Sequence, residues 1–126
     1  DVYLRIPIYV GPSQEEAYAD AEQSTMTSYR RMATNFAASA TAAGATIDED
    51  RAKRGEALAA VTYQDLIRDR LAYGSPDGVI TQLKTITDEL GLSGIVAETN
   101  VGGLIPREKI SRSIDLFCKE VVPALR

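Results

Sequence analysis

The sequence predicts an α/β protein whose strands run parallel and belong to a larger sheet. Residues 2–10 and 95–99 have the pattern of β-strands, and long helical segments separate them. Strands that are joined by long helical crossovers pair in parallel, and a parallel sheet needs cover on both faces. Two strands are too few for a stable sheet, and the chain has more helical sequence than two strands can use. We therefore expect further polypeptide to complete the fold.

Residues 2–10 alternate in the way of a strand with one buried face. Apolar side chains occupy every second position as far as the turn at Gly11 and Pro12. This period of two, rich in β-forming residues, predicts a strand. Pro7 lies inside it, and because proline has no backbone N–H to donate, we expect an irregular stretch or a missing hydrogen bond there.

A long helix is predicted to follow the strand. Ser13 and Glu16 have the spacing of a capping box, and acidic residues suit the positive end of a helix. Side chains at helical spacing then predict a helix from Gln14 to the high thirties: Tyr18, Ala21, Thr25, Tyr29, Met32 and Phe36.

Residues 45–56 are dense in charged side chains, which predicts a flexible, solvated loop or a loosely held helical start. An active-site lid is the alternative, because long loops often carry function.

Two further helices are predicted before the second strand. One covers residues 57–71 with a break near Thr62, and Gly74 ends that segment. The other runs over residues 76–90, with Ser75 as its N-cap and a proline at its first position.

The last third of the chain predicts a short strand, a glycine loop and a closing helix. The strand covers residues 95–99, and Gly102 and Gly103 form the loop after it. Pro106 opens the final helix, and Pro123 is expected to kink or end it.

The composition excludes several classes of function. Without histidine, the chain alone can build neither a Ser-His-Asp triad nor a histidine-ligated metal site, and we assign no metal. A net charge of −4 with no basic stripe argues against nucleic-acid binding. No apolar run approaches the ~18 residues of a membrane span. The single cysteine, Cys118, fits a cytoplasmic location and is expected to be buried on the apolar side of the last helix.

The second half of the chain resembles one known family. The residues that carry the resemblance are Gly74-Ser75-Pro76-Asp77, Leu90-Gly91, Gly94-Ile95, Gly102-Gly103, Pro106, Leu116-Phe117 and Glu120-Val121-Val122-Pro123. Their order and spacing are similar to the C-terminal end of the luciferase-like, flavin-dependent monooxygenase superfamily. Residues 2–17 also resemble the seventh strand of that family and the start of the helix after it, whereas residues 37–62 match none of its motifs.

The resemblance implies a C-terminal fragment of a TIM (β/α)8 barrel. Residues 1–126 would form part of a single barrel domain, about the last two strand–helix units with extra helices. Residues 2–10 would be the seventh strand and residues 95–99 the eighth. A TIM barrel has roughly 250 residues or more, so the main partner of this chain would be the remainder of the barrel upstream of Asp1.

The resemblance also implies an activity for the full-length protein. Reduced FMN, supplied by a flavin reductase, and oxygen would oxidise a small-molecule substrate, and the enzyme would be a homo-oligomer. The fragment alone would be inactive. One alternative is a deazaflavin-dependent oxidoreductase on the same barrel, and the other is a helical interaction module without catalysis.

In this family the active-site histidine and most flavin contacts lie upstream, so we name no catalytic residue. Active sites of TIM barrels lie at the C-terminal ends of the strands. That rule and the resemblance nominate six residues as substrate- or cofactor-proximal: Glu98, Asn100, Gly102, Gly103, Arg70 and Ser75.

Each nominated residue also has a purely structural interpretation. Glu98 and Asn100 would either touch the ligand or satisfy backbone groups of the glycine loop, and the two glycines supply backbone freedom. Ser75 either caps its helix or helps its N-terminus receive an anion. Arg70 either meets an anionic substrate group or lies on a solvated helix face.

Overall fold

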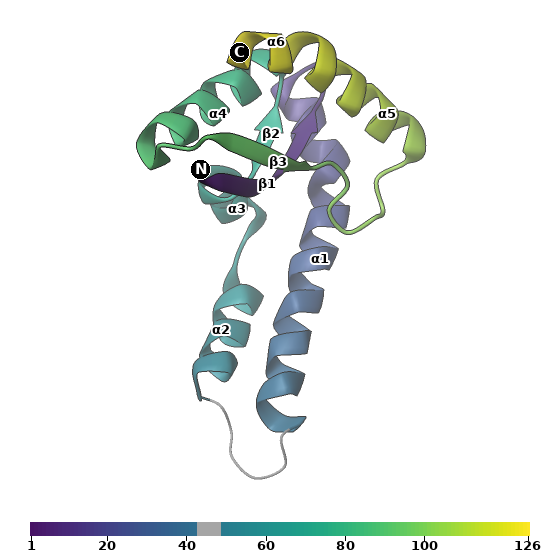
Figure 1. Cartoon of the computed structure of the whole chain (residues 1–126). Helices are drawn as coiled ribbons and strands as arrows, with labels where there is room; N and C mark the ends of the chain where they lie inside the picture. The colour runs from purple at the N-terminus through teal and green to yellow at the C-terminus, as the bar shows by residue number, and fades with distance from the viewer. Residues whose placement is uncertain (43–48) are drawn as a thin grey trace.

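The computed structural model describes residues 1–42 and 49–126 and shows a mixed α/β fold, mostly helical, with a small parallel sheet (Figure 1). In chain order, the elements of these residues are β1 (Tyr3–Val10), α1 (Gln14–Ala42), α2 (Glu49–Ala60), α3 (Tyr63–Asp69), β2 (Ala72–Gly74), α4 (Pro76–Leu90), β3 (Gly94–Glu98), α5 (Arg107–Leu116), the π-helical turn η1 (Phe117–Val121) and α6 (Val122–Leu125). None of the helices in this described part is long and apolar enough to cross a membrane.

The sheet has the order β2-β1-β3, and both pairings are parallel. The N-terminal part of β1 pairs with β3, from Tyr3 opposite Gly94 to Pro7 opposite Glu98. The pairing with β2 begins at the next residue, Ile8. Pro7 therefore lies where β1 changes from one partner strand to the other. At this position the missing N–H falls at the end of a run of backbone hydrogen bonds and does not interrupt it.

The expected parallel pairing of residues 2–10 with residues 95–99 is confirmed by β1 and β3. A barrel would place its strands side by side in sequence order, whereas β1 lies between β2 and β3. The described residues thus form an open sheet of three strands and no closed barrel.

The sequence analysis missed β2. Ala72–Gly74 is too short to show a period of two, and its place in the sheet depends on contact with β1, since Tyr73 lies opposite Tyr9. The rings of these two tyrosines meet edge to face, with their centroids 6.2 Å apart. Such tertiary contacts decide short strands more than local pattern does.

Of the two structures expected for residues 45–56, the helical start describes the chain from Glu49 on, where α2 begins; residues 45–48 lie outside the described residues. Asp50, Lys53, Arg54 and Glu56 of this stretch lie on a helix that packs against α1 (Figure 1). Gly55 allows the contact, because a Cβ atom there would lie 3.3 Å from the carbonyl oxygen of Ala33. Packing against a second helix thus overrides weak local propensity.

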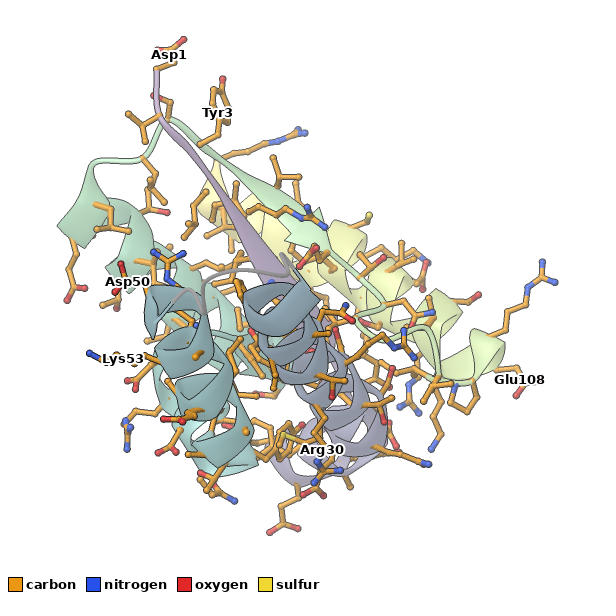
Figure 2. The ribbon with its side chains drawn as sticks, turned by 90° about the horizontal axis from the view of Figure 1, so that it is seen from below. Asp1, Tyr3, Arg30, Asp50, Lys53 and Glu108 are labelled. Atoms are coloured by element: carbon orange, nitrogen blue, oxygen red, sulfur yellow. The ribbon has the colours of Figure 1, made fainter. Side chains whose placement is uncertain are left out.

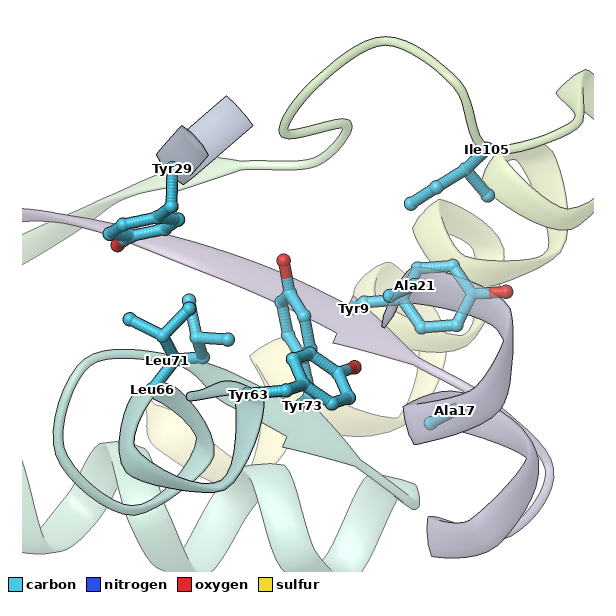
Figure 3. Close-up of a cluster of buried hydrophobic side chains, with 9 residues drawn as sticks. All are labelled: Tyr9, Ala17, Ala21, Tyr29, Tyr63, Leu66, Leu71, Tyr73 and Ile105. Atoms are coloured by element: carbon cyan, nitrogen blue, oxygen red, sulfur yellow. The ribbon is translucent and has the colours of Figure 1, made fainter. Parts of the chain in front are cut away.

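The two faces of the sheet pack against different helices. Even-numbered side chains of β1 lie against α4 and η1 in one core, formed by Ile6, Ile8, Val10, Ala72, Val79, Leu83 and Val121. Odd-numbered side chains near the C-terminal end of β1 lie against α1 and α3 in the other, formed by Tyr9, Ala17, Ala21, Tyr29, Tyr63, Leu66, Leu71, Tyr73 and Ile105 (Figure 3).

The odd face is uncovered along the N-terminal half of the sheet. Tyr3 in β1 is 62% exposed and Val96 in β3 is 52% exposed. Figure 2 shows the Tyr3 side chain standing free beside the N-terminus of the chain. A parallel sheet normally has cover on both faces, so this half of the odd face is open to a further layer.

The closing helix changes its pitch before Pro123, as expected for a proline inside a helical segment. The N–H of Val122 donates to the carbonyl oxygen of Phe117, five residues earlier, at the end of η1. A π-turn of this kind changes the hydrogen-bonding pattern of the helix, so that a proline, which has no N–H to donate, can follow it. Cys118 lies in this turn and is exposed, so its expected burial is wrong. The extra residue in the π-turn shifts the side-chain positions away from the apolar stripe of α5.

Candidate functional site

A cavity of about 610 Å³ lies on the odd face of the sheet, beside the C-terminal end of β3. It is lined by Arg5, Pro7, Ser28, Tyr29, Met32, Arg70, Glu98, Asn100, Val101 and Gly102. Four of the six nominated residues, Arg70, Glu98, Asn100 and Gly102, therefore meet in one place, although Arg70 comes from a different part of the chain. The volume is in the usual range for small-molecule pockets, about 300–1,000 Å³.

Glu98 forms an ion pair across two strands. It is the last residue of β3 and its carboxylate contacts the guanidinium of Arg5 in β1. The register places Pro7 opposite Glu98 and Val96 opposite Arg5, so the two charged side chains are diagonal neighbours on one face. An exposed pair contributes little to stability, but it compensates the negative charge of Glu98 within the cavity.

Arg70 provides the uncompensated positive charge of this cavity. It follows α3, where its backbone N–H donates to the carbonyl oxygen of Leu66. The neighbouring Arg68 binds Asp65 and Asp69 with nitrogen–oxygen distances of 3.2 and 3.0 Å. Among the side chains that the structure describes, none forms an ion pair with Arg70. Its guanidinium is thus free to bind an anionic ligand in the cavity.

Tyr29 is the functional candidate that the sequence analysis did not identify. Its side chain is buried in α1, yet it lines the cavity, and within the described residues its hydroxyl has no hydrogen-bond partner. Burial raises the pKa of Tyr29, the Arg70 charge lowers it and the Glu98 charge raises it, for a net pKa above 10.0. The hydroxyl therefore stays protonated at neutral pH and can donate a hydrogen bond beside Arg70.

Ser24, and not Glu98, holds the glycine loop against α1. The Ser24 hydroxyl donates to the carbonyl oxygen of Val101 and accepts from the N–H of Leu104 at 2.9 Å. Gly102 has φ of +85°, and a Cβ atom on it would come within 2.0 Å of the Ser24 carbonyl oxygen. The missing side chain of Gly102 thus makes room for α1. Gly103 also has a positive φ, of +71°, but it does not line the cavity.

Ser75 lies apart from this cavity and caps α4. Its hydroxyl accepts a hydrogen bond from the N–H of Gly78 at 3.3 Å. The oxygen is therefore already engaged in the role that N-cap residues usually have. Among the described residues, no group of three or more Cys, Asp or Glu side chains is placed to hold a metal ion.

These residues fit an anionic small molecule better than the ring system of a flavin. Arg70 and Tyr29 both line the cavity and offer it hydrogen-bond donors, which suits a carboxylate, sulfonate or phosphate group. Gly102 could in principle let a flat ring approach the backbone closely. The space that its missing side chain leaves is instead occupied by α1. A flavin bound here would thus meet this chain through its phosphate or through one edge of the cavity.

Comparisons with known proteins find a likeness in fold to solved structures. No protein-family model and no curated protein matches the sequence. The fold is similar to the crystal structure of monooxygenase RslO1 from Streptomyces bottropensis, with a TM-score of 0.62 and 20% identity. The match covers 100% of this chain but 31% of that one. At this identity the likeness concerns the fold, and the chain spans less than a third of the RslO1 chain.

Proposed function

We propose that this chain forms part of a flavin-dependent monooxygenase, in which reduced FMN and oxygen oxidise a small organic substrate. The observation that carries the proposal is the cavity where Glu98, Asn100, Gly102 and Arg70 come together. These residues come together at the C-terminal end of β3, and a barrel enzyme of this type would bind its substrate at that end of its strands. The similarity in fold to a monooxygenase supports the same conclusion.

In this proposal the residues of the cavity bind and position the substrate. Arg70 and the Tyr29 hydroxyl hold an anionic group, and Asn100 offers an amide to a second polar group. The Arg5–Glu98 ion pair forms a polar wall that carries no net charge. The flavin would supply the oxidation chemistry, and the residues that hold its ring would come from other parts of the complete enzyme.

The proposal is tested by measuring oxygen consumption of the intact protein with photoreduced FMN, in the presence and absence of small organic acids. We expect FMN-dependent oxygen uptake that a substrate increases, and we expect Arg70→Gln to raise KM more than it lowers kcat. Arg68→Gln is the matched control, since Arg68 binds only acidic neighbours on its own helix.

Two results would overturn the proposal. If the intact protein bound neither oxidised nor reduced FMN, it would not be a flavin enzyme of this type. Binding of a deazaflavin in place of FMN, with hydride transfer and no oxygen uptake, would instead identify the oxidoreductase alternative.

A further inference from the structure

A second cavity, of about 500 Å³, lies between α1 and α2. It shares Tyr29, Met32 and Arg70 with the cavity beside β3. The two spaces therefore adjoin at these three side chains. Apart from Arg70, the residues that line the second cavity come from two stretches, 29–36 and 54–61.

The wall of the second cavity is mostly apolar, and the two charged side chains that line it are both positive. Its apolar wall comes from Met32 and Phe36 in α1 and from Leu58 in α2, with Val61 after it. Its charged residues are Arg54 and Arg70, and neither forms an ion pair with any residue that the structure describes. The chain as a whole carries a net charge of −4, so this concentration of positive charge is local to the cavity.

The helix pair that builds this groove is in close contact. At Gly55 the backbone of α2 approaches α1 so nearly that a Cβ atom would lie 3.4 Å from the Cβ of Phe36. Figure 1 shows α1 and α2 extending side by side away from the sheet. A linear molecule can therefore lie along the groove with one end at Tyr29 and Arg70.

We propose that the two cavities form one bipartite site for a linear aliphatic acid. Arg70 and the Tyr29 hydroxyl bind the carboxylate at the junction, and the groove between α1 and α2 holds the alkyl chain. The length of this groove then sets the chain length that the protein prefers. The inference deepens the proposed monooxygenase function by naming a substrate class, but binding of the acid requires no flavin.

The test is isothermal titration calorimetry of the intact protein, without flavin, against butyrate, octanoate and decanoate. Because burying one methylene is worth about 0.8 kcal/mol, affinity should rise by up to about fourfold for each methylene that enters the groove. Arg70→Gln should weaken decanoate binding by about tenfold or more, through loss of a charged hydrogen bond. The same variant should leave binding of the neutral 1-decanol unchanged, and Arg68→Gln should change neither.

A groove-filling variant separates the alkyl site from the carboxylate site. Ala57 is exposed and lines the groove, so Ala57→Trp should weaken decanoate binding by at least tenfold and leave butyrate binding intact. Ala59 is exposed on the same helix and does not line the groove, so Ala59→Trp is the control. If Ala57→Trp does not fold, Met32→Trp blocks the junction of the two cavities instead.

The inference is overturned if affinity does not depend on chain length, if Ala57→Trp and Ala59→Trp behave alike, or if Arg54→Gln weakens decanoate binding more than Arg70→Gln does. Decanoate binding in a protein that takes up no oxygen with reduced FMN would refute the monooxygenase proposal and leave this site standing. Oxygen uptake without any binding of aliphatic acids would refute the site alone.

Discussion

A single missing side chain determines how closely the glycine loop approaches α1. Gly102 has a positive φ, and the space that its side chain would fill is occupied by the backbone of Ser24. The neighbouring Gly103 has a similar backbone conformation with nothing within 4 Å of its missing Cβ. Substituting each glycine in turn therefore separates the cost of backbone strain, which both variants have, from the cost of steric overlap, which only the Gly102 variant has.

Gly102→Ala should lower the free energy of unfolding by more than Gly103→Ala does. Both variants place alanine in the left-handed region, at a cost of about 1–2 kcal/mol. Only the Gly102 variant also pushes a methyl group against the Ser24 carbonyl and displaces the loop. Urea unfolding followed by circular dichroism measures both, and equal midpoints for the two variants would show that the loop does not touch α1.

Asp20 is the acceptor of a small network between β1, α1 and α5. Its carboxylate accepts hydrogen bonds from the Tyr9 hydroxyl at 2.9 Å, Lys109 at 2.7 Å and Arg112 at 3.0 Å, and its side chain is 6% exposed. Burial raises the pKa of Asp20. The hydrogen bonds from Lys109 and Tyr9 and the charges of Lys109 and Arg112 lower this pKa by more, so the net pKa is below 3.8. Burial and the bond to Asp20 raise the pKa of Tyr9 to about 12, so its hydroxyl remains a donor.

Asp20→Asn should destabilise the protein at neutral pH by about 1–3 kcal/mol, the usual worth of hydrogen bonds to a charged group. Because the folded-state pKa of Asp20 lies below the unfolded-state value, its stabilisation is complete above about pH 4 and is lost as the pH falls through the folded-state pKa. The variant should therefore lose less stability on acidification than the wild type. Thermal unfolding between pH 3 and 7 tests this, with Glu16→Gln as the control, since Glu16 is an exposed partner of Arg112.

Among the helices, α4 is the one whose ends are most clearly encoded locally. Ser75 caps it, and Gly91 ends it with a φ of +61°. Ser75→Ala should lower the free energy of unfolding by about 1 kcal/mol, whereas Ser75→Gly should cost only a few tenths. Neither change should alter ligand binding, because Ser75 does not line the cavity. A loss of affinity for anions in both variants would instead give Ser75 a role in the site.

The sequence predicts an element well when its signals are local. The N-cap of α4, the alternation of β1 and the break at Thr62 all depend on residues a few positions apart, and each lies where it was expected. The strand β2 and the first part of α2 could not be predicted in this way. Their structure depends on Tyr9 and on α1, which are distant in the sequence, and charged or very short segments carry no periodic signal of their own.

The candidate site could be predicted in part for the same reason. Glu98 ends a strand and Asn100 and Gly102 follow it, so the rule that sites lie at strand ends predicts all three. Tyr29 could not be separated from the core, because it lies on the same helical stripe as Thr25 and Met32. Its hydroxyl is the signal that the sequence offers, since a tyrosine on the buried stripe of a helix places a polar group inside.

The sheet as a whole is covered on one face and partly bare on the other. The even face of β1 packs against α4 and η1 in one core. On the odd face, the side chains of Tyr3 and Val96 are exposed. Within the described residues, the outer edge of β3 pairs with no strand, and such edges tend to pair with another strand. In the proposed enzyme, further polypeptide would cover both features.

The 126-residue chain taken alone should therefore self-associate. Exposed apolar residues on a strand with a free edge favour contact between copies, so sedimentation velocity should show a mass above 13.6 kDa that rises with concentration. Val96→Lys should shift the protein toward monomer, because a lysine on the open face opposes strand-to-strand contact. Ile114→Lys, on the exposed side of α5 and 39% exposed in the wild type, should not. A monomer at all concentrations would mean that this face is stable in water, and the chain would then be a module that needs no further strands.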